Sequence, residues 1–257
     1  MKPIDLSQLK VYPLAERDSM AGIEETLINP ASTPAELSPA NRDHVTRCAA
    51  NIRAARESGA SIMYIYGAHL IKNGAHLLME KLMADGWITH LATNGAGVIH
   101  DWEWAFHGQS TECVRSNVAT GTFGTWEETG RYLHLALLAG AINVEGFGQS
   151  VGRMVAEDGL SLPSRAELES QLRGEPTHPL SPARAELLGA MTRHELAEGR
   201  HDVPHPWKSS CVLANAIKHD VPLSVHPGIG YDIISNHPMF NGAALGRAAG
   251  TDFASFG

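Results

Sequence analysis

The chain has 257 residues, of which 43% are apolar and 19% are charged, a profile typical of a folded globular protein. Its formal net charge is -8 and its Lys and Arg residues are not clustered, so we expect no nucleic-acid partner. No apolar run approaches the length of a membrane span, and the N-terminus lacks a signal-peptide pattern. We therefore expect no membrane partner and a cytoplasmic location.

Predicted helices and strands alternate along the chain. The first 40 residues, rich in Pro and Ser, are predicted to be an N-terminal arm. Apolar residues at helical spacing then predict helices over residues 41–58, 75–84, 98–107, 126–141, 145–158, 186–198 and 209–219. Thr125 and Glu128 have the spacing of a capping box at the start of one of these helices. Buried strands are predicted over residues 61–66, 88–93 and 221–226, and the last residues, 252–256, look strand-like.

This alternation defines the fold class. Strands separated by helices favour an α/β fold, with a Rossmann-like parallel sheet that carries helices on both faces. We expect residues 41–257 to form a single α/β domain, with a helical and loop insertion over about 145–208. Ligands of such sheets bind at the carboxyl ends of the strands, so the turns that follow the strands are the first places to look for function.

Two such turns follow the first two strands. In the second turn, glycines lie between a strand and a helix, where backbone N–H groups can approach a phosphate closely. The alternative is a tight strand-to-helix turn that binds nothing, because the full G-x-G-x-x-G pattern is absent. The candidate ligand-binding residues of the two turns are Gly67, Ala68, His69, Thr93, Asn94, Gly95 and Gly97.

A third turn follows the last predicted strand at the same edge of the sheet. It contains Gly228, Gly230 and Asp232, and this carboxylate could bind a ribose hydroxyl or a substrate ammonium group, or simply cap a helix. The glycine-rich segment Glu145–Gly152 lacks a clear preceding strand. Its glycines are expected to permit close packing of a helix instead of binding a cofactor.

His100 and Asp101 come just after the second turn. A histidine at the mouth of a ligand site, with a carboxylate beside it, could transfer protons. Asp101 could equally be a carboxylate that only stabilises its helix. The fourteen histidines show no pair at metal-binding spacing on a predicted helix, and the cysteines form no C-x-x-C pair, so no metal site is predicted.

At these turns the chain resembles the deoxyhypusine synthase-like NAD-binding superfamily. The matching parts are the strand and turn over residues 65–74, the segment Thr-Asn-Gly-Ala-Gly-Val-Ile-His-Asp ending at Asp101, and the helix and strand over residues 209–222. The same Asn-Gly-Ala-Gly-Val-Ile-His-Asp segment is similar to the NAD-binding module of arginine dihydrolase and ornithine cyclodeaminase proteins. The resemblance spans roughly residues 45–255.

The resemblance implies a function. It implies that NAD binds across the three turns and that an amine or amino-acid substrate is oxidised to an imine, in deoxyhypusine synthase-like transferase or cyclodeaminase-like chemistry. We also expect a homo-oligomer. His100 and Asp101 would be the catalytic residues. The chain departs from the pattern at Ala68 and His69, where the superfamily has Ser-Asn, and it offers no equivalent of the catalytic lysine, for which Lys72 is a poor substitute.

Three hypotheses follow from the sequence. The first is an NAD-dependent enzyme acting on an amine or amino acid. The second is a catalytically inactive NAD- or ligand-binding or assembly subunit that kept the fold without the lysine. A metal-dependent hydrolase that uses the histidines ranks last.

Overall fold

The structure is a computed structural model that describes residues 5–256. Its central sheet has three parallel strands in the order β2-β3-β7, formed by Met63–Ile65, His90–Thr93 and Leu223–Val225. The register pairs Tyr64 with Leu91, and Ala92 with Ser224. The structure confirms the predicted α/β class and the positions of the three strands.

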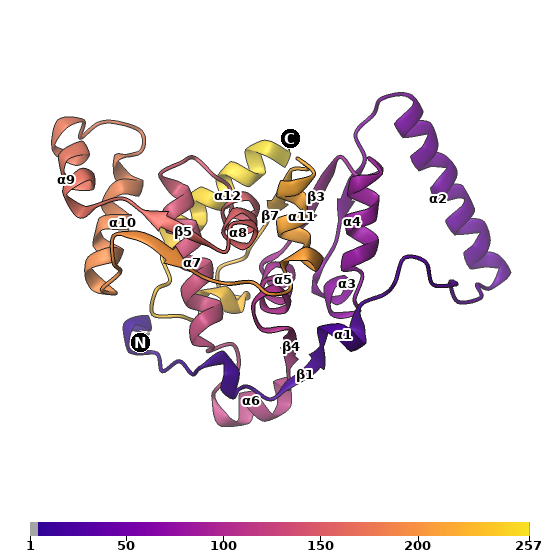
Figure 1. Cartoon of the computed structure of the whole chain (residues 1–257), viewed down its shortest axis with the longest axis horizontal. Helices are drawn as coiled ribbons and strands as arrows, with labels where there is room; N and C mark the ends of the chain where they lie inside the picture. The colour runs from indigo at the N-terminus through magenta and orange to yellow at the C-terminus, as the bar shows by residue number, and fades with distance from the viewer. Residues whose placement is uncertain (1–4, 257) are drawn as a thin grey trace.

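Helices surround this sheet (Figure 1). The α-helices are α1 Ile23–Thr26, α2 Pro39–Glu57, α3 Ala68–Lys72, α4 His76–Ala84, α5 Gly95–His107, α6 Val114–Thr120, α7 Glu127–Ala141, α8 Phe147–Ala156, α9 Arg165–Gly174, α10 Ser181–Arg193, α11 Val212–Lys218 and α12 Gly242–Phe256. Short 3-10 helices are η1 Leu6–Gln8, η2 Leu14–Glu16, η3 Lys208–Ser210 and η4 Ile233–Ser235. Four further strands are β1 Ser19–Gly22, β4 Gln109–Glu112, β5 Gly159–Leu162 and β6 Gly199–Asp202.

Helices cover both faces of the sheet. Every residue of β3 and β7 is buried, as expected for parallel strands between two helical layers. On one face, the ring of Phe256 from α12 packs edge-on against His90, with ring centroids 5.9 Å apart. Leu91, the next residue of β3, points to the other face and joins the main core that contains Ile71 and Met79. The prediction of helices on both faces is confirmed.

The two edges of the sheet differ. Helix α8 covers the β7 edge, where Gly148 packs so closely that a Cβ atom would lie 1.9 Å from the carbonyl oxygen of Leu223. The glycines of the Glu145–Gly152 segment therefore serve helix packing, as predicted. At the other edge, all three residues of β2 are exposed. The prediction that this strand is buried was wrong, because within residues 5–256 helix α2 borders only an open pocket beside Ser61–Met63 and leaves the β2 side chains exposed.

Two buried carboxylates hold helices in place through their N-terminal N–H groups. Asp101 on α5 accepts hydrogen bonds from the backbone N–H groups of Val212 (3.0 Å) and Leu213 (2.8 Å) at the start of α11. Asp252 on α12 accepts from Phe147 and Gly148 at the start of α8 and from Val225 of β7. A helix N-terminus has free N–H donors and a partial positive charge, so each carboxylate ties two or three elements together.

The N-terminal segment is packed against the domain. Strand β1 pairs antiparallel with β4, and Leu14 and Ile23 are buried in the main core. Arg17 is also buried and forms an ion pair with Glu103 of α5. The part of the predicted arm that the structure describes is therefore integrated in the fold up to about α1, while residues 30–40 are exposed.

Other elements lie outside the main layers. Helices α9 and α10 contribute to a second core cluster, whereas α8, which the sequence grouped with the insertion, belongs to the main core. Helix α2 projects away from the body, and none of its residues is buried (Figure 1).

Residues 252–256 form the end of helix α12, so their strand-like interpretation was wrong. Within residues 5–256, no helix is both long and apolar enough to cross a lipid bilayer.

The Asp101 contact predicts a loss of stability in Asp101→Asn. The amide keeps one acceptor oxygen but turns its NH₂ group toward a buried donor, so the free energy of unfolding should fall by roughly 2 kcal/mol. Urea denaturation measures this change. Asp85→Asn, at an exposed carboxylate paired with Lys81, is the control and should change stability by less than about 0.5 kcal/mol. Equal effects of the two substitutions would contradict the capping role.

Candidate functional site

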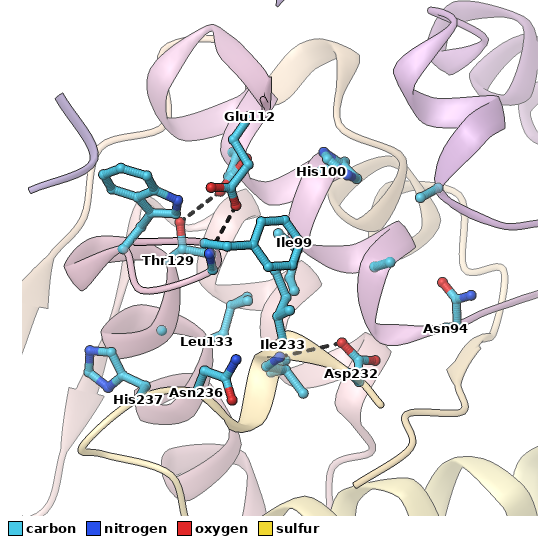
Figure 2. A pocket seen from close by; sticks show the side chains of 18 of the residues that line it. Asn94, Ile99, His100, Glu112, Thr129, Leu133, Asp232, Ile233, Asn236 and His237 are labelled. Carbon is cyan, nitrogen blue, oxygen red and sulfur yellow. Dashed lines mark hydrogen bonds between the residues drawn. The ribbon is translucent and has the colours of Figure 1, made fainter. Parts of the chain in front are cut away.

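A cavity of about 380 Å³ lies beyond the carboxyl ends of β2 and β3. The first residues of α3 and α5 form one wall, and the segment that contains η4 forms another. Figure 2 shows Asn94, His100, Glu112, Thr129 and Asp232 around it. This size is within the range of small-molecule sites, and the position is the one that open α/β sheets use for ligands.

The structure brings together part of the predicted site. Of the first two turns, Ala68, His69 and Asn94 line the cavity. The other predicted residues of these two turns do not line the cavity. Gly67 precedes the first turn of α3, Thr93 is buried and donates its hydroxyl to the carbonyl oxygen of Tyr66, and Gly97 packs against the Thr93 side chain.

The third turn contributes Asp232 to the cavity, but its glycines do not line it. Gly228 packs against the ring of Tyr231, and Gly230 adopts a left-handed φ of 100°, which glycine tolerates without strain. The Asp232 side chain reaches the first turn of α5, where a Cβ atom on Gly95 would lie 1.9 Å from its Oδ2 atom. The third turn therefore closes over the second through this carboxylate.

The Asp232 carboxylate decides how an anionic cofactor could fit. The N-terminus of α5 is the place where a Rossmann-like fold would hold a pyrophosphate. In this structure Asn94 accepts from the N–H group of Gly97 (2.9 Å), and Asp232 lies against Gly95. A phosphate cannot share this position with a carboxylate. The cavity beyond has room for a small ligand, but the pyrophosphate of NAD fits only if Asp232 moves.

His100 lines the cavity as a neutral imidazole. Burial lowers the pKa of His100 to about 4, and the positive charges of Lys72 and Arg17 act in the same direction, while Glu103 opposes them. Its Nδ1 atom lies 2.7 Å from the hydroxyl oxygen of Ser110. At neutral pH the ring therefore carries no charge, and its unprotonated nitrogen can accept a hydrogen bond from a ligand.

Asp101 lies outside the cavity. Its carboxylate is wholly buried and is held by the N-terminus of α11, as described above. The Nε2 atom of His76 on α4 lies 3.6 Å from Asp101 Oδ1, and burial lowers the pKa of His76. The predicted pair of His100 and Asp101 does not form at the cavity, because successive residues of a helix point in directions about 100° apart. Asp101 supports the fold instead.

The cavity contains charged residues that were not among the predicted site residues. Lys72, which the sequence analysis placed in the first turn only as a poor substitute for a catalytic lysine, lines the cavity with His69 and forms no ion pair with any residue in the described part of the chain. Glu112 is the last residue of strand β4, which was not predicted, and its carboxylate accepts from Asn117 (2.6 Å) and from the N–H group of Gly124 (3.1 Å). Glu112 on β4 and Lys72 on α3 are far apart in sequence, and only the fold brings them to one cavity.

The cavity holds both signs of charge. Lys72 is a cation, while Glu112 and Asp232 are acidic, and burial raises the pKa of Asp232. No group of three or more His, Cys, Asp or Glu residues with metal-binding geometry occurs within residues 5–256. The arrangement suits a small polar organic ligand with both an ammonium and an acidic group.

Comparisons with known proteins add little to this site. No family model and no curated protein matches the chain. Among solved structures, a conserved putative LOR/SDH protein from Methanococcus maripaludis S2 is similar over 87% of this chain and 49% of its own, with 15% identity and a TM-score of 0.33. The chain thus spans about half the length of that protein. The resemblance to the deoxyhypusine synthase-like superfamily stays a prediction.

The shifted histidines predict that acid destabilises the fold. Burial lowers the pKa of His100, His134 and His205 to about 4, so between pH 6.5 and 4 the unfolded chain binds more protons than the folded chain. Stability is therefore complete above pH 6.5 and is lost as the pH falls. Burial raises the pKa of Asp252 to about 6, which has the opposite sign because the folded state then binds the proton first.

Because three histidines oppose one aspartate, the free energy of unfolding should fall by on the order of 3 kcal/mol between about pH 7 and about pH 5. Urea denaturation across this range measures it. A stability that is flat or rises toward pH 5 would contradict the neutral state of these rings.

Proposed function

We propose that the chain is an enzyme that binds a small amine or amino acid in this cavity and uses His100 as its proton acceptor. The observation that supports this proposal is a neutral histidine at the carboxyl edge of the sheet, in a cavity with charges of both signs. The resemblance adds NAD as the cofactor, which would accept a hydride from the amine-bearing carbon when bound. Of the predicted cofactor-binding residues, four line the cavity: Ala68, His69, Asn94 and Asp232.

The charges suggest how a substrate would lie. An α-amino acid carries a carboxylate that Lys72 can neutralise and an ammonium group that Glu112 or Asp232 can accept. His100 would take a proton from the substrate nitrogen and leave the neutral amine, whose carbon can then be oxidised. Because burial keeps the His100 pKa low, the ring stays unprotonated throughout the neutral range and its lone pair is free to contact the substrate nitrogen, and His100 can take up the proton only once the bound substrate raises its pKa.

The second candidate is a ligand-binding or assembly subunit without catalysis. The observation that favours it is the carboxylate of Asp232 at the N-terminus of α5, which takes the place of an external phosphate. A fold that no longer needs its cofactor can keep such a contact because it satisfies the helix terminus internally. The two candidates differ in whether Asp232 leaves this position when NAD is added.

NAD titration with Asp232→Asn tests the proposal. Removing the negative charge beside the α5 N-terminus should tighten NAD binding by about tenfold, seen as a larger rise of the melting temperature with NAD. Asp43→Asn, at an exposed carboxylate on α2, is the matched control. Weaker binding in Asp232→Asn would mean that the carboxylate binds the ribose instead. No NAD-dependent stabilisation of either protein would contradict the cofactor proposal and leave the subunit candidate ahead.

Loss of the proton acceptor should separate catalysis from binding. In His100→Gln the cavity keeps a polar side chain of similar reach but loses the basic nitrogen, so turnover of an amine or amino-acid substrate should fall by about 100-fold or more. Reduced-nicotinamide absorbance measures turnover, and thermal shift measures NAD binding, which should change by less than about threefold. Parallel losses of both would show that His100 only supports the structure.

We further propose that the chain works as a homo-oligomer through its exposed β2 edge. Ile65 of β2 and Phe253 of α12 are 68% and 70% exposed and line one shallow apolar groove. An uncovered edge strand and a helix that stands alone in water, such as α2, are both unfavourable in a monomer. A second copy of the chain would cover them.

Ile65→Lys should shift the protein toward the monomer, because the added charge would be buried in the contact. Light scattering after size-exclusion chromatography measures the mass. Val118→Lys, at a 59% exposed residue on α6, is the control and should leave the mass unchanged. A monomeric unaltered protein would contradict the proposal.

A further inference from the structure

A buried chain of hydrogen bonds leads from the N-terminal segment to the cavity. Arg17 donates to both oxygens of Glu103, at 2.7 and 2.9 Å. Thr129 of α7 donates to Oε1 of Glu103, and Ser110 of β4 donates to Oε2 at 2.7 Å. The other contact of the Ser110 hydroxyl is Nδ1 of His100, at 2.7 Å. Three elements and the N-terminal segment therefore meet at one buried carboxylate.

The position of each proton in this chain can be worked out. The bidentate contact with Arg17 keeps Glu103 ionised, so the carboxylate can only accept hydrogen bonds. The hydroxyl of Ser110 has a single proton, and its 2.7 Å approach to Glu103 requires that proton to lie between the two oxygens. The Ser110 oxygen must then accept from His100, which means that Nδ1 carries a hydrogen atom.

We propose that Ser110 and Glu103 are positioning residues that fix His100 as the neutral tautomer with hydrogen on Nδ1 and a lone pair on Nε2. The inference rests on the proposed function, in which His100 accepts a proton from the ligand. Nε2 makes no hydrogen bond with any residue in the described part of the chain, so its lone pair is available to a molecule in the cavity. Ser110 and Glu103 set which nitrogen acts, and neither needs to touch the substrate.

Backbone strain beside Ser110 supports this assignment. Thr111 has a left-handed φ of 70°, which is unfavourable for a β-branched residue, and its buried hydroxyl has no hydrogen-bond partner. The strained residue lies between Ser110, which contacts His100, and Glu112, which lines the cavity. Strain of this kind persists only where the surrounding structure enforces it, and here it accompanies two residues placed at the site.

The charged groups around His100 agree with a neutral ring. Lys72 and His69 face it from α3, Arg17 from the N-terminal segment, and Glu103 from its own helix. The positive charge of Arg17 largely cancels that of Glu103, because the two are directly paired. The carboxylate therefore orients the imidazole through Ser110 while its pairing with Arg17 limits how strongly it favours protonation of the ring.

Nitrogen NMR of the ligand-free protein tests the proposal. In the unaltered protein, ¹⁵N shifts of His100 should show hydrogen on Nδ1 and a bare Nε2, with this tautomer favoured by about tenfold, the ratio that one hydrogen bond of ordinary strength supports. Hydrogen on Nε2 in the unaltered protein would overturn the inference. Because no substrate is present, this result is independent of whether the chain is an enzyme.

Ser110→Ala should remove the preference, so that the shifts of the two ring nitrogens move toward each other. Ser150→Ala is the matched control, because Ser150 is also buried but its hydroxyl donates to the carbonyl oxygen of Gly146, the N-cap residue of α8, away from His100. Unchanged His100 shifts in Ser110→Ala would overturn the role of Ser110. If that variant does not fold, the tautomer of the unaltered protein still decides the inference. A correct tautomer without NAD binding or turnover would contradict the proposed function alone.

Discussion

Buried carboxylates at helix N-termini are the contacts on which the rest of this structure depends. A small parallel sheet of three short strands cannot by itself orient the helices around it. Asp101 holds the start of α11, and Asp252 holds the start of α8 together with β7. In each case an acid from one helix supplies the anion that another helix terminus attracts. The desolvation cost of each carboxylate is offset by two or three N–H donors.

A carboxylate also lies at a helix N-terminus in the cavity, where it affects which ligands can bind. Asp232 lies against Gly95 at the start of α5 as Asp101 does at α11, but this helix start faces the cavity. A terminus that binds an internal carboxylate is electrostatically equivalent to one that binds a phosphate. An anion could occupy this helix terminus only by displacing Asp232. Burial already raises the pKa of Asp232, which makes its charged form easier to displace.

The sequence predicts the parts of the fold that depend on local patterns. Strands β3 and β7 and helices α4, α5, α7 and α11 follow from periodicity, and the turn at Asn94 follows from its position between strand and helix. The pattern could not predict the short antiparallel pair β1–β4, since β4 is polar, β1 has only four residues without an apolar alternation, and their pairing is long-range. The capping box at Thr125 fails for the same reason: Glu128 instead accepts from the backbone N–H group of Leu14.

These long-range contacts also decide the chemistry of the site. His100 was predicted to work with Asp101, its neighbour in sequence, yet its partner is Ser110 on a strand that exists only because residues 19–22 pair with it. Arg17, from the segment predicted to be an arm, completes the same network through Glu103. The N-terminal segment is thus part of the site's support, and the protonation of His100 depends on residues that its local sequence does not contain.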